Sequence, residues 1–323
     1  MNTKPPGIHH VTAIAGEPQR NVDFYVGVLG LRLVKKTVNF DDPGTYHLYY
    51  GDGVGTPGTV MTFFPWAHAP KGRRGAGQVV ATAFSVAQEA LPFWEERLKE
   101  NGVVVAERIG RFGEEGFAFE DPDGLLLEIL ALAETDAREG WTDGPVPVEN
   151  AIKGFAGATL LERDRRKTED LLTGVLGFRA IGEDGNRFRY EAGGGEGEPA
   201  AVLDVVGDPD AGRGNPVVGT VHHIAFRVPD EETERALREE VASLGYNATP
   251  VIDRNYFRSV YFREPGGVLF EIATDVPGFA VDEPVEELGT SLKLPPQYES
   301  RRGQLEESLT PIEPPRFGKG ARA

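Results

Sequence analysis

Residues 7–16 read GIHHVTAIAG, and residues 220–230 read TVHHIAFRVPD. Each segment carries a pair of adjacent histidines inside an alternating apolar pattern, which predicts a β-strand. Each is followed by a stretch with helical periodicity and then by short strand-like runs that Gly and Pro interrupt. The chain is therefore expected to repeat a unit that begins with a strand bearing a histidine pair.

A second pair of segments shares the other end of this unit. EDPDGLLLEILALA at 120–133 matches REPGGVLFEIATD at 263–275, and both predict a turn followed by a buried strand with one glutamate. Residues 154–181 suggest a further copy, because their VLGF repeats the VLGL of residues 28–31. Both VLG sequences are predicted to end a helix, where Gly is the favoured left-handed residue.

Four modules, each a strand, a helix and three strands, account for most of the chain. They span residues 7–66, 77–133, 152–206 and 217–275. This predicts an α+β fold of four βαβββ modules arranged in two halves. The expected parts are an N-terminal half at 1–135, a linker at 136–151, a C-terminal half at 152–279 and a C-terminal extension at 280–323.

The composition disfavours several classes of protein. The 323 residues carry a net charge of −17, which disfavours nucleic acid as a partner because phosphates need a cationic surface. No run of about 18 apolar residues is present, and the first residues lack the apolar core of a secretory signal, so we expect a cytoplasmic protein without membrane spans. The sequence has no cysteine, so any metal must be bound through nitrogen and oxygen.

The repeated modules resemble those of the vicinal oxygen chelate superfamily, which contains glyoxalases, bleomycin-resistance proteins and extradiol dioxygenases. Residues 7–66 are similar to the ring-cleaving dioxygenases that act on hydroquinones. The resemblance continues through HHIAF at 222–226, DRNYFRSVYFREPGGVLFEIATD at 253–275 and LGTSLKLPPQYESRR at 288–302. It therefore covers most of the chain, and the combination is more specific than any one segment.

The resemblance implies that each module curls into half of a cup, with metal ligands on the first and last strands of paired modules. Neighbouring side chains on a strand face opposite ways, so only one histidine of each pair can face the cup. The second members, His10 and His223, share one register, and Glu271 is the carboxylate on a last strand. A carboxylate inside the apolar run VLFEIA is costly to bury unless it is paired or binds a metal.

Comparison of the modules indicates which two form the cup. The positions expected to be equivalent are Ala81 and Gly157 on first strands, and Thr62, Glu128 and roughly Val205 on last strands. The complete ligand set is therefore His10, His223 and Glu271, and module one must pair with module four. Two imidazoles and one carboxylate are the ligand set of non-haem Fe(II) oxygenases, so we expect Fe(II), with Mn(II) or another divalent ion as the alternative.

The resemblance also carries catalytic roles to Arg254, Tyr261, Thr12, His222 and His9. Arg254 is expected to orient a phenolate, and Tyr261 to hydrogen-bond the substrate or the bound oxygen. Thr12 shares a strand face with His10. Alternation turns His222 and His9 away from the metal unless the strands bulge, and His222 is a candidate acid or base. Four residues are left open as cavity lining or core: His47, Phe40, Phe64 and Trp66.

The function that the resemblance implies is insertion of both atoms of O₂ into a hydroquinone-type ring. The partners are then a small aromatic substrate and O₂, and a homodimer is the expected assembly. Two alternatives stay open at this point. One is a glyoxalase-like isomerase or lyase that uses a different divalent ion, and the other is a resistance protein that binds a drug or quinone without turnover.

Overall fold

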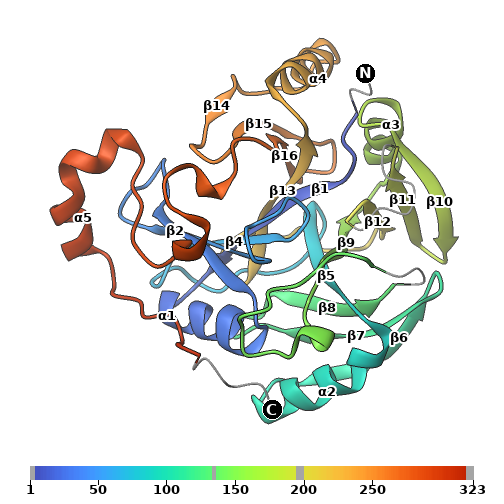
Figure 1. The fold of residues 1–323 in the computed structure, drawn as a ribbon. Coiled ribbons are helices and arrows are strands. Elements are labelled where there is room, and N and C mark those ends of the chain that lie inside the picture. The colour runs from blue at the N-terminus through green and yellow to red at the C-terminus, as the bar shows by residue number, and fades with distance from the viewer. Residues whose placement is uncertain (1–3, 133–135, 194–199, 318–323) are drawn as a thin grey trace.

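The computed structural model describes residues 4–132, 136–193 and 200–317. Within these ranges, two curled sheets of eight strands each form the body of the molecule (Figure 1). The α+β fold expected from the sequence is confirmed. The predicted end of the N-terminal half, at residue 135, lies outside the described residues.

The first sheet combines the first and fourth modules. Its strand order is β14-β15-β16-β13-β1-β4-β3-β2. The bounds of these strands are β1 Ile8–Ala15, β2 Arg32–Val38, β3 Tyr46–Gly51, β4 Val60–Pro65, β13 Thr220–Val228, β14 Ile252–Asp253, β15 Arg258–Arg263 and β16 Leu269–Thr274. Strands β1 and β13 are antiparallel neighbours at the centre, which confirms the pairing of module one with module four.

The second sheet combines the second and third modules in the same way. Its order is β10-β11-β12-β9-β5-β8-β7-β6, with β5 and β9 antiparallel at the centre. The bounds are β5 Gln78–Val86, β6 Val105–Arg111, β7 Glu114–Glu120, β8 Leu126–Ala131, β9 Gly154–Glu162, β10 Phe178–Asp184, β11 Arg187–Ala192 and β12 Val202–Gly207. Each sheet therefore takes strands from both sides of residues 136–151.

Short helices lie outside the two sheets (Figure 1). The α-helices are α1 Pro18–Val22, α2 Leu91–Glu100, α3 Arg166–Gly174, α4 Glu231–Ser243 and α5 Arg302–Ser308. The remaining turns are the π-helical η1 Asp23–Val28 and the 3₁₀ segments η2 Gln88–Ala90, η3 Val148–Asn150, η4 Phe279–Val281, η5 Val285–Glu287 and η6 Pro296–Arg301. None of the described helices is both long and apolar enough to cross a membrane.

Local sequence sets where the helices begin and end. The backbone N–H of Thr233 donates to the Asp230 side chain, which caps α4. Gly30 and Gly177 have φ of +67° and +72°, so the Gly of each VLG sequence adopts the left-handed conformation expected after a helix. A Cβ on Gly30 would also lie only 2.5 Å from the Val146 side chain. The helix ends predicted from the two VLG sequences are therefore confirmed.

The C-terminal extension packs beside β2 (Figure 1). The fully buried Lys35 ammonium lies 2.6 Å from carboxylates of both Asp282 and Glu283. The Tyr298 hydroxyl donates to the backbone oxygen of Phe40, at 2.9 Å. Because a buried charge is tolerated only with a partner, these contacts tie the extension to the sheet that carries the histidine pairs.

The register corrects one residue of the module comparison. Glu271 pairs with Ala225, two residues after His223, and Asp204 pairs with Thr159 in the third module. Since Thr159 lies two residues after Gly157, the equivalent of Glu271 is Asp204, and the expectation of Val205 was wrong. A shift of one residue moves a side chain to the other face of a strand.

Candidate metal centre

Three donor atoms converge in the first sheet. His10 Nε2 lies 3.3 Å from His223 Nε2 and 3.2 Å from Glu271 Oε2, and His223 Nε2 lies 2.8 Å from the same oxygen. All three residues are buried. They meet because β16, β13 and β1 are consecutive strands of one sheet. Among the described residues, this is the one group of three or more His, Asp or Glu side chains that fits a metal ion.

The spacing of these atoms fits a bound ion. Adjacent ligands of a six-coordinate ion with bonds of about 2.1 Å are about 3.0 Å apart, close to the observed separations. Glu271 Oε2 is buried and makes no hydrogen bond of acceptable geometry with any described residue. Its second oxygen, Oε1, accepts a hydrogen bond from the Ser259 hydroxyl. One oxygen of Glu271 is thus held by a hydroxyl, and the other faces the two ring nitrogens without a hydrogen bond to either, as expected if an ion binds between the three atoms.

The ionisation of these groups also suits a cation. Burial lowers the pKa of His223, although the Glu271 carboxylate opposes this shift. Burial alone would raise the pKa of Glu271, but the imidazoles of His10 and His223 hold it well below its usual range. A neutral imidazole and an ionised carboxylate are the forms in which these side chains bind metal ions.

The first histidine of each pair contacts the ring of the second. His9 Nδ1 lies 2.9 Å from His10 Nδ1, and His222 Nδ1 lies 2.7 Å from His223 Nδ1. When Nε2 of His10 or His223 binds an ion, its Nδ1 carries the hydrogen and donates it to the neighbouring ring. His9 and His222 therefore orient the two candidate ligands.

Two β-bulges explain why the first histidine of each pair contacts the ring of the second. In the pairing of β1 with β13, Ile8 faces Phe226 and His10 faces Ala225, so His9 has no opposite residue. A second shift in the same pairing leaves His222 without one. An extra residue in one strand re-aims its side chain, and here it brings the first histidine of each pair beside the second.

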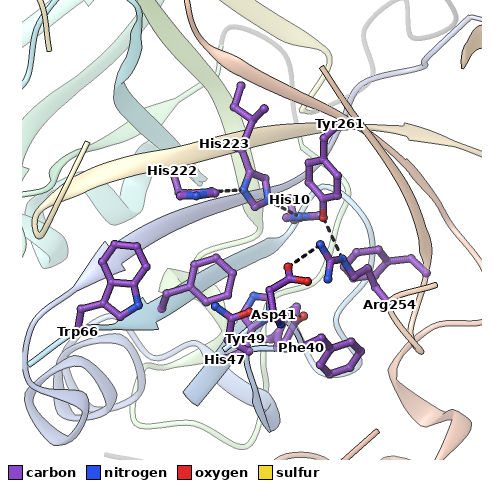
Figure 2. Close-up of a pocket in the computed structure, with 14 residues that line it drawn as sticks. His10, Phe40, Asp41, His47, Tyr49, Trp66, His222, His223, Arg254 and Tyr261 are labelled. Carbon is purple, nitrogen blue, oxygen red and sulfur yellow. Dashed lines mark hydrogen bonds and ion pairs between the residues drawn. The ribbon is translucent and has the colours of Figure 1, made fainter. Parts of the chain in front are cut away.

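A cavity of about 280 Å³ opens in front of the metal ligands (Figure 2). Its lining includes His10, His222 and His223, and the residues that the sequence left open as lining or core: Phe40, His47, Phe64 and Trp66. Asn39, Asp41, Tyr49, Phe257 and Leu269 also line it. The cavity is thus mostly aromatic, with polar groups at defined points, which suits a small aromatic ligand.

Arg254 and Tyr261 lie together at one side of this cavity (Figure 2). Arg254 Nε is 3.3 Å from the Tyr261 hydroxyl, and its Nη2 is 3.1 Å from Asp41 Oδ2. Tyr261 pairs with Glu271 across β15 and β16. Burial raises the pKa of Tyr261, and the Glu271 charge adds to the rise, so the phenol stays protonated and can donate a hydrogen bond.

Thr12 and His9 lie behind the cavity and are not among its lining residues. Thr12 is fully buried, and its Oγ1 lies 2.8 Å from Thr62 Oγ1. His9 packs against the Phe257 ring. Of the five predicted catalytic residues, Arg254, Tyr261 and His222 therefore reach the cavity, whereas Thr12 and His9 can act only through neighbours.

A hydrogen-bonded chain continues from Thr12 into the cavity wall. His47 Nε2 lies 2.8 Å from Thr62 Oγ1, and the Tyr49 hydroxyl lies 2.8 Å from His47 Nδ1. Burial lowers the pKa of His47 well below its usual value, so the ring is neutral. Sequence reasoning left His47 undecided and did not include Tyr49 or Ser259. The only available signal was the spacing of His47 and Tyr49, which puts both on one strand face.

The corresponding place in the second sheet contains ion pairs. Arg189 Nε lies 2.8 Å from Asp204 Oδ1, and its Nη1 lies 2.8 Å from Glu114 Oε1. Arg111 pairs with Glu128, the register equivalent of Glu271. The space left between them is only about 10 Å³. Guanidinium groups thus occupy the position that an ion would need.

Comparisons with known proteins agree with this geometry. The profile of the "Glyoxalase/Bleomycin resistance protein/Dioxygenase superfamily" matches residues 7–129 and 155–272. The chain is 53% identical to "Putative ring-cleaving dioxygenase MhqO" of Bacillus subtilis (strain 168), over 97% of this chain and 98% of that protein. It is 40% identical to the "Chlorohydroquinone/hydroquinone 1,2-dioxygenase" of Sphingobium indicum, over 93% of this chain and 94% of that protein.

A solved structure extends the similarity to three dimensions. A crystal structure described as a "putative dioxygenase from Bacillus subtilis subsp. subtilis str. 168" superimposes with a TM-score of 0.92 at 51% identity, over 97% of this chain and 99% of that one. The matched profile, the relatives and the shared fold all cover both sheets. The chain therefore belongs to the glyoxalase/bleomycin resistance protein/dioxygenase superfamily.

Proposed function

We propose that the protein is a ring-cleaving dioxygenase that inserts both atoms of O₂ into a hydroquinone-type ring at a single Fe(II) ion. The observation that carries this proposal is the group of His10, His223 and Glu271 at the base of an aromatic cavity. Three ligands from the protein leave coordination positions free for a substrate oxygen and O₂. The names of its relatives, one of them a chlorohydroquinone/hydroquinone 1,2-dioxygenase, support the same activity.

The chemistry that a bound Fe(II) supplies is activation of O₂ beside a deprotonated substrate oxygen. The side chains around it hold and orient the ring. Arg254, cationic and fixed by Tyr261 and Asp41, stabilises the negative charge of a phenolate. The protonated Tyr261 hydroxyl donates to an oxygen of the substrate. The aromatic walls exclude water and pack against the ring.

His222 is the candidate that handles a proton at the cavity wall. Its Nδ1 faces His223, which leaves Nε2 without a partner among the described residues. Burial lowers the pKa of His222 to about 3, so the ring is neutral near pH 7. Because Nδ1 accepts the hydrogen of His223 Nδ1, the hydrogen of the neutral His222 ring is on Nε2, and His222 is therefore placed to donate a hydrogen bond to a substrate oxygen in the cavity.

The observed contacts favour this activity over the two alternatives. In a four-ligand isomerase, Thr62 would stand where a further ligand is needed, but its hydroxyl is engaged by Thr12 and His47. A protein that only sequesters a ligand has no need of the unsatisfied, buried Glu271 oxygen. The three candidate metal ligands and the polar groups beside them together support the dioxygenase reaction.

Oxygen consumption tests the proposal directly. Protein purified without oxygen and loaded with Fe(II), or with Mn(II) as the alternative ion, is expected to consume O₂ with hydroquinone or chlorohydroquinone. With ¹⁸O₂, mass spectrometry should find both labelled atoms in one acyclic product. Absence of O₂ uptake with every hydroquinone and catechol would overturn the proposal. Metal-dependent turnover without O₂ would instead favour the isomerase.

We further propose that the protein acts in the cytoplasm as a homodimer. We also propose that the chain divides into an N-terminal half at 1–135, a linker at 136–151, a C-terminal half at 152–279 and an extension at 280–323. Light scattering during gel filtration measures the molar mass and hence the oligomeric state. Limited proteolysis tests whether the linker is accessible.

A further inference from the structure

A second cavity of about 380 Å³ lies beside the one at the metal ligands. Trp66, His222 and Leu269 line both cavities, so these three side chains form a shared wall. We propose that this second cavity, the basic chamber, binds the carboxylate of the ring-opened product. The inference rests on the proposed function, because it takes its ligand from that reaction.

The basic chamber has cationic walls. Its lining residues include Arg213 and Arg263 and no Asp or Glu from the part of the chain that the structure describes. Both arginines are exposed. Arg263 Nη1 donates to the backbone oxygen of Gly267 at 2.9 Å, which holds this side chain at the chamber without neutralising it. Two guanidinium groups without an acidic neighbour in the lining are suited to a carboxylate.

The chamber is built from segments of both sheets. Arg263 ends β15 of the first sheet, whereas Gln78 begins β5 of the second. Arg213 lies on a loop that is held by backbone pairing of Arg73 with Asn215 and of Ala76 with Arg213. The position of the arginines therefore depends on how the two sheets pack, and not on a single mobile loop.

Gln78 adds an independent observation. This side chain is 5% exposed, and its Nε2 is buried without a hydrogen-bond partner among the described residues. Its Oε1 accepts from the backbone N–H of Gly75 at 3.0 Å, which settles the orientation of the amide. A buried donor left without an acceptor is costly. A carboxylate in the chamber supplies acceptor oxygens next to this residue.

The chemistry of ring cleavage gives such a ligand. Hydroquinone (C₆H₆O₂) and O₂ combine to one acyclic product, C₆H₆O₄, without any other reactant. The bond between a hydroxyl-bearing carbon and its neighbour breaks, the first carbon becomes a carboxylic acid, and the second becomes an aldehyde. The acid then loses its proton at neutral pH. The reaction thus converts a neutral molecule into an anion inside the first cavity.

Charge separates the two sides of the first cavity. Asp41 lines it on the side of Arg254 and is largely exposed, and the whole chain carries a charge of −17. Asp41 offsets the charge of Arg254 on that side, whereas no carboxylate lines the chamber beyond His222, so an anion is attracted past His222 toward Arg213 and Arg263. A further cavity of about 460 Å³ shares Arg213, Gly266 and Gly267 with the chamber, and its other charged lining residues are the basic Arg163 and Lys167 and the acidic Glu162 and Asp164. The two arginines of the chamber itself therefore supply the attraction for a carboxylate.

The test uses trans,trans-muconate, an acyclic six-carbon dicarboxylate that resembles the product and contains no ring to cleave. Calorimetry on the full-length protein, with and without Fe(II), measures its affinity in the unaltered chain and in Arg213→Gln, Arg263→Gln and the double variant. Arg235→Gln is the matched control, because Arg235 is an exposed arginine on α4 and does not line the chamber. Circular dichroism confirms that each variant is folded.

Muconate is expected to bind about tenfold more weakly to the double variant and with unchanged affinity to the control. The uncharged dimethyl ester of muconate should bind to the unaltered protein and to every variant with the same affinity. Equal muconate affinity in the unaltered protein and the double variant would overturn the inference. Equally strong competition by inorganic phosphate would also overturn it, since the chamber would then be a general anion site.

The outcome is separable from that of the proposed function. If the protein consumes O₂ with hydroquinone but the double variant binds muconate normally, the function stands and the chamber has no role in product binding. If no O₂ is consumed but muconate binding depends on Arg213 and Arg263, the chamber is a carboxylate site and the proposed reaction is wrong.

Discussion

His10 Nε2 lies 3.3 Å from His223 Nε2, although the two residues are 213 positions apart in the sequence. The contact exists because β1 and β13 are antiparallel neighbours at the centre of one sheet. Neither the first module nor the fourth contains a complete ligand set. The metal centre can therefore form only after the two ends of the chain have paired.

Loss of one histidine should remove the metal. In His223→Ala, one imidazole and one carboxylate remain, and we expect metal affinity to fall by more than the 10- to 100-fold that is typical of losing a neighbour of a ligand. Elemental analysis after gel filtration measures the metal content. Glu128→Gln is the matched control, because Glu128 occupies the equivalent strand position in the second sheet. Full metal content in His223→Ala would contradict the site.

Replacement of Arg254 by lysine should slow turnover of hydroquinones. Lysine keeps the charge but cannot reproduce the planar contacts of Arg254 with Tyr261 and Asp41. Hydrogen bonds to charged groups contribute about 1.5–3 kcal/mol, so kcat/KM should fall at least about tenfold. An oxygen electrode measures the rate. Arg258→Lys, which alters a half-exposed pair with Glu231, should change kcat/KM less than twofold, at about the scale of a surface ion pair.

The Thr62 hydroxyl should be needed for full activity but not for metal binding. Thr62→Val removes the group that links Thr12 to His47 and leaves their buried polar atoms without a partner, which costs about 1–3 kcal/mol of stability. We expect normal metal content and a kcat reduced by roughly tenfold, at 1.4 kcal/mol per factor of ten. Thr62→Ser keeps the hydroxyl and should restore kcat. Equal kcat in the two variants would show that the hydrogen bonds from Thr12 through Thr62 to His47 have only a structural role.

Glu162 should make stability depend on pH. Burial, and the nearby Glu264 carboxylate, raise the pKa of Glu162 to about 8 from its ordinary value of 4.5. The folded protein thus holds this proton more tightly than the unfolded chain. The contribution of Glu162 to the free energy of unfolding is fully present below about pH 4.5 and is lost progressively as the pH rises to about 8.

Glu162→Gln tests this pH dependence, because the amide cannot ionise. Urea unfolding between pH 5 and pH 8.5 should show that the unaltered protein loses a few kcal/mol more than the variant over this range. Glu183→Gln, at an exposed position, is the control and should follow the unaltered protein. Parallel pH profiles for Glu162→Gln and the unaltered protein would contradict the prediction.

Local sequence was sufficient for the fold and the identity of the candidate ligands. Strand alternation, the glycines after the helices and the repeated histidine pairs are properties of short segments, and they placed His10 and His223 in equivalent first-strand positions and Glu271 on a last strand. The family resemblance supplied the way in which the modules close. Among the predicted catalytic residues, Arg254, Tyr261 and His222 do line the cavity.

Other features depended on contacts that no short segment encodes. Two bulges between β1 and β13 turn His9 and His222 toward the ligand rings, and the strand register puts Asp204 at the position expected for Val205. The basic chamber exists only because the sheets pack together and bring Gln78 near Arg263. The sequence by itself therefore determined which side chains have the chemistry, since that is a property of residue type and strand period. Only the tertiary structure decided which side chains beyond the three candidate ligands meet at the site, because register and packing are set by the whole chain.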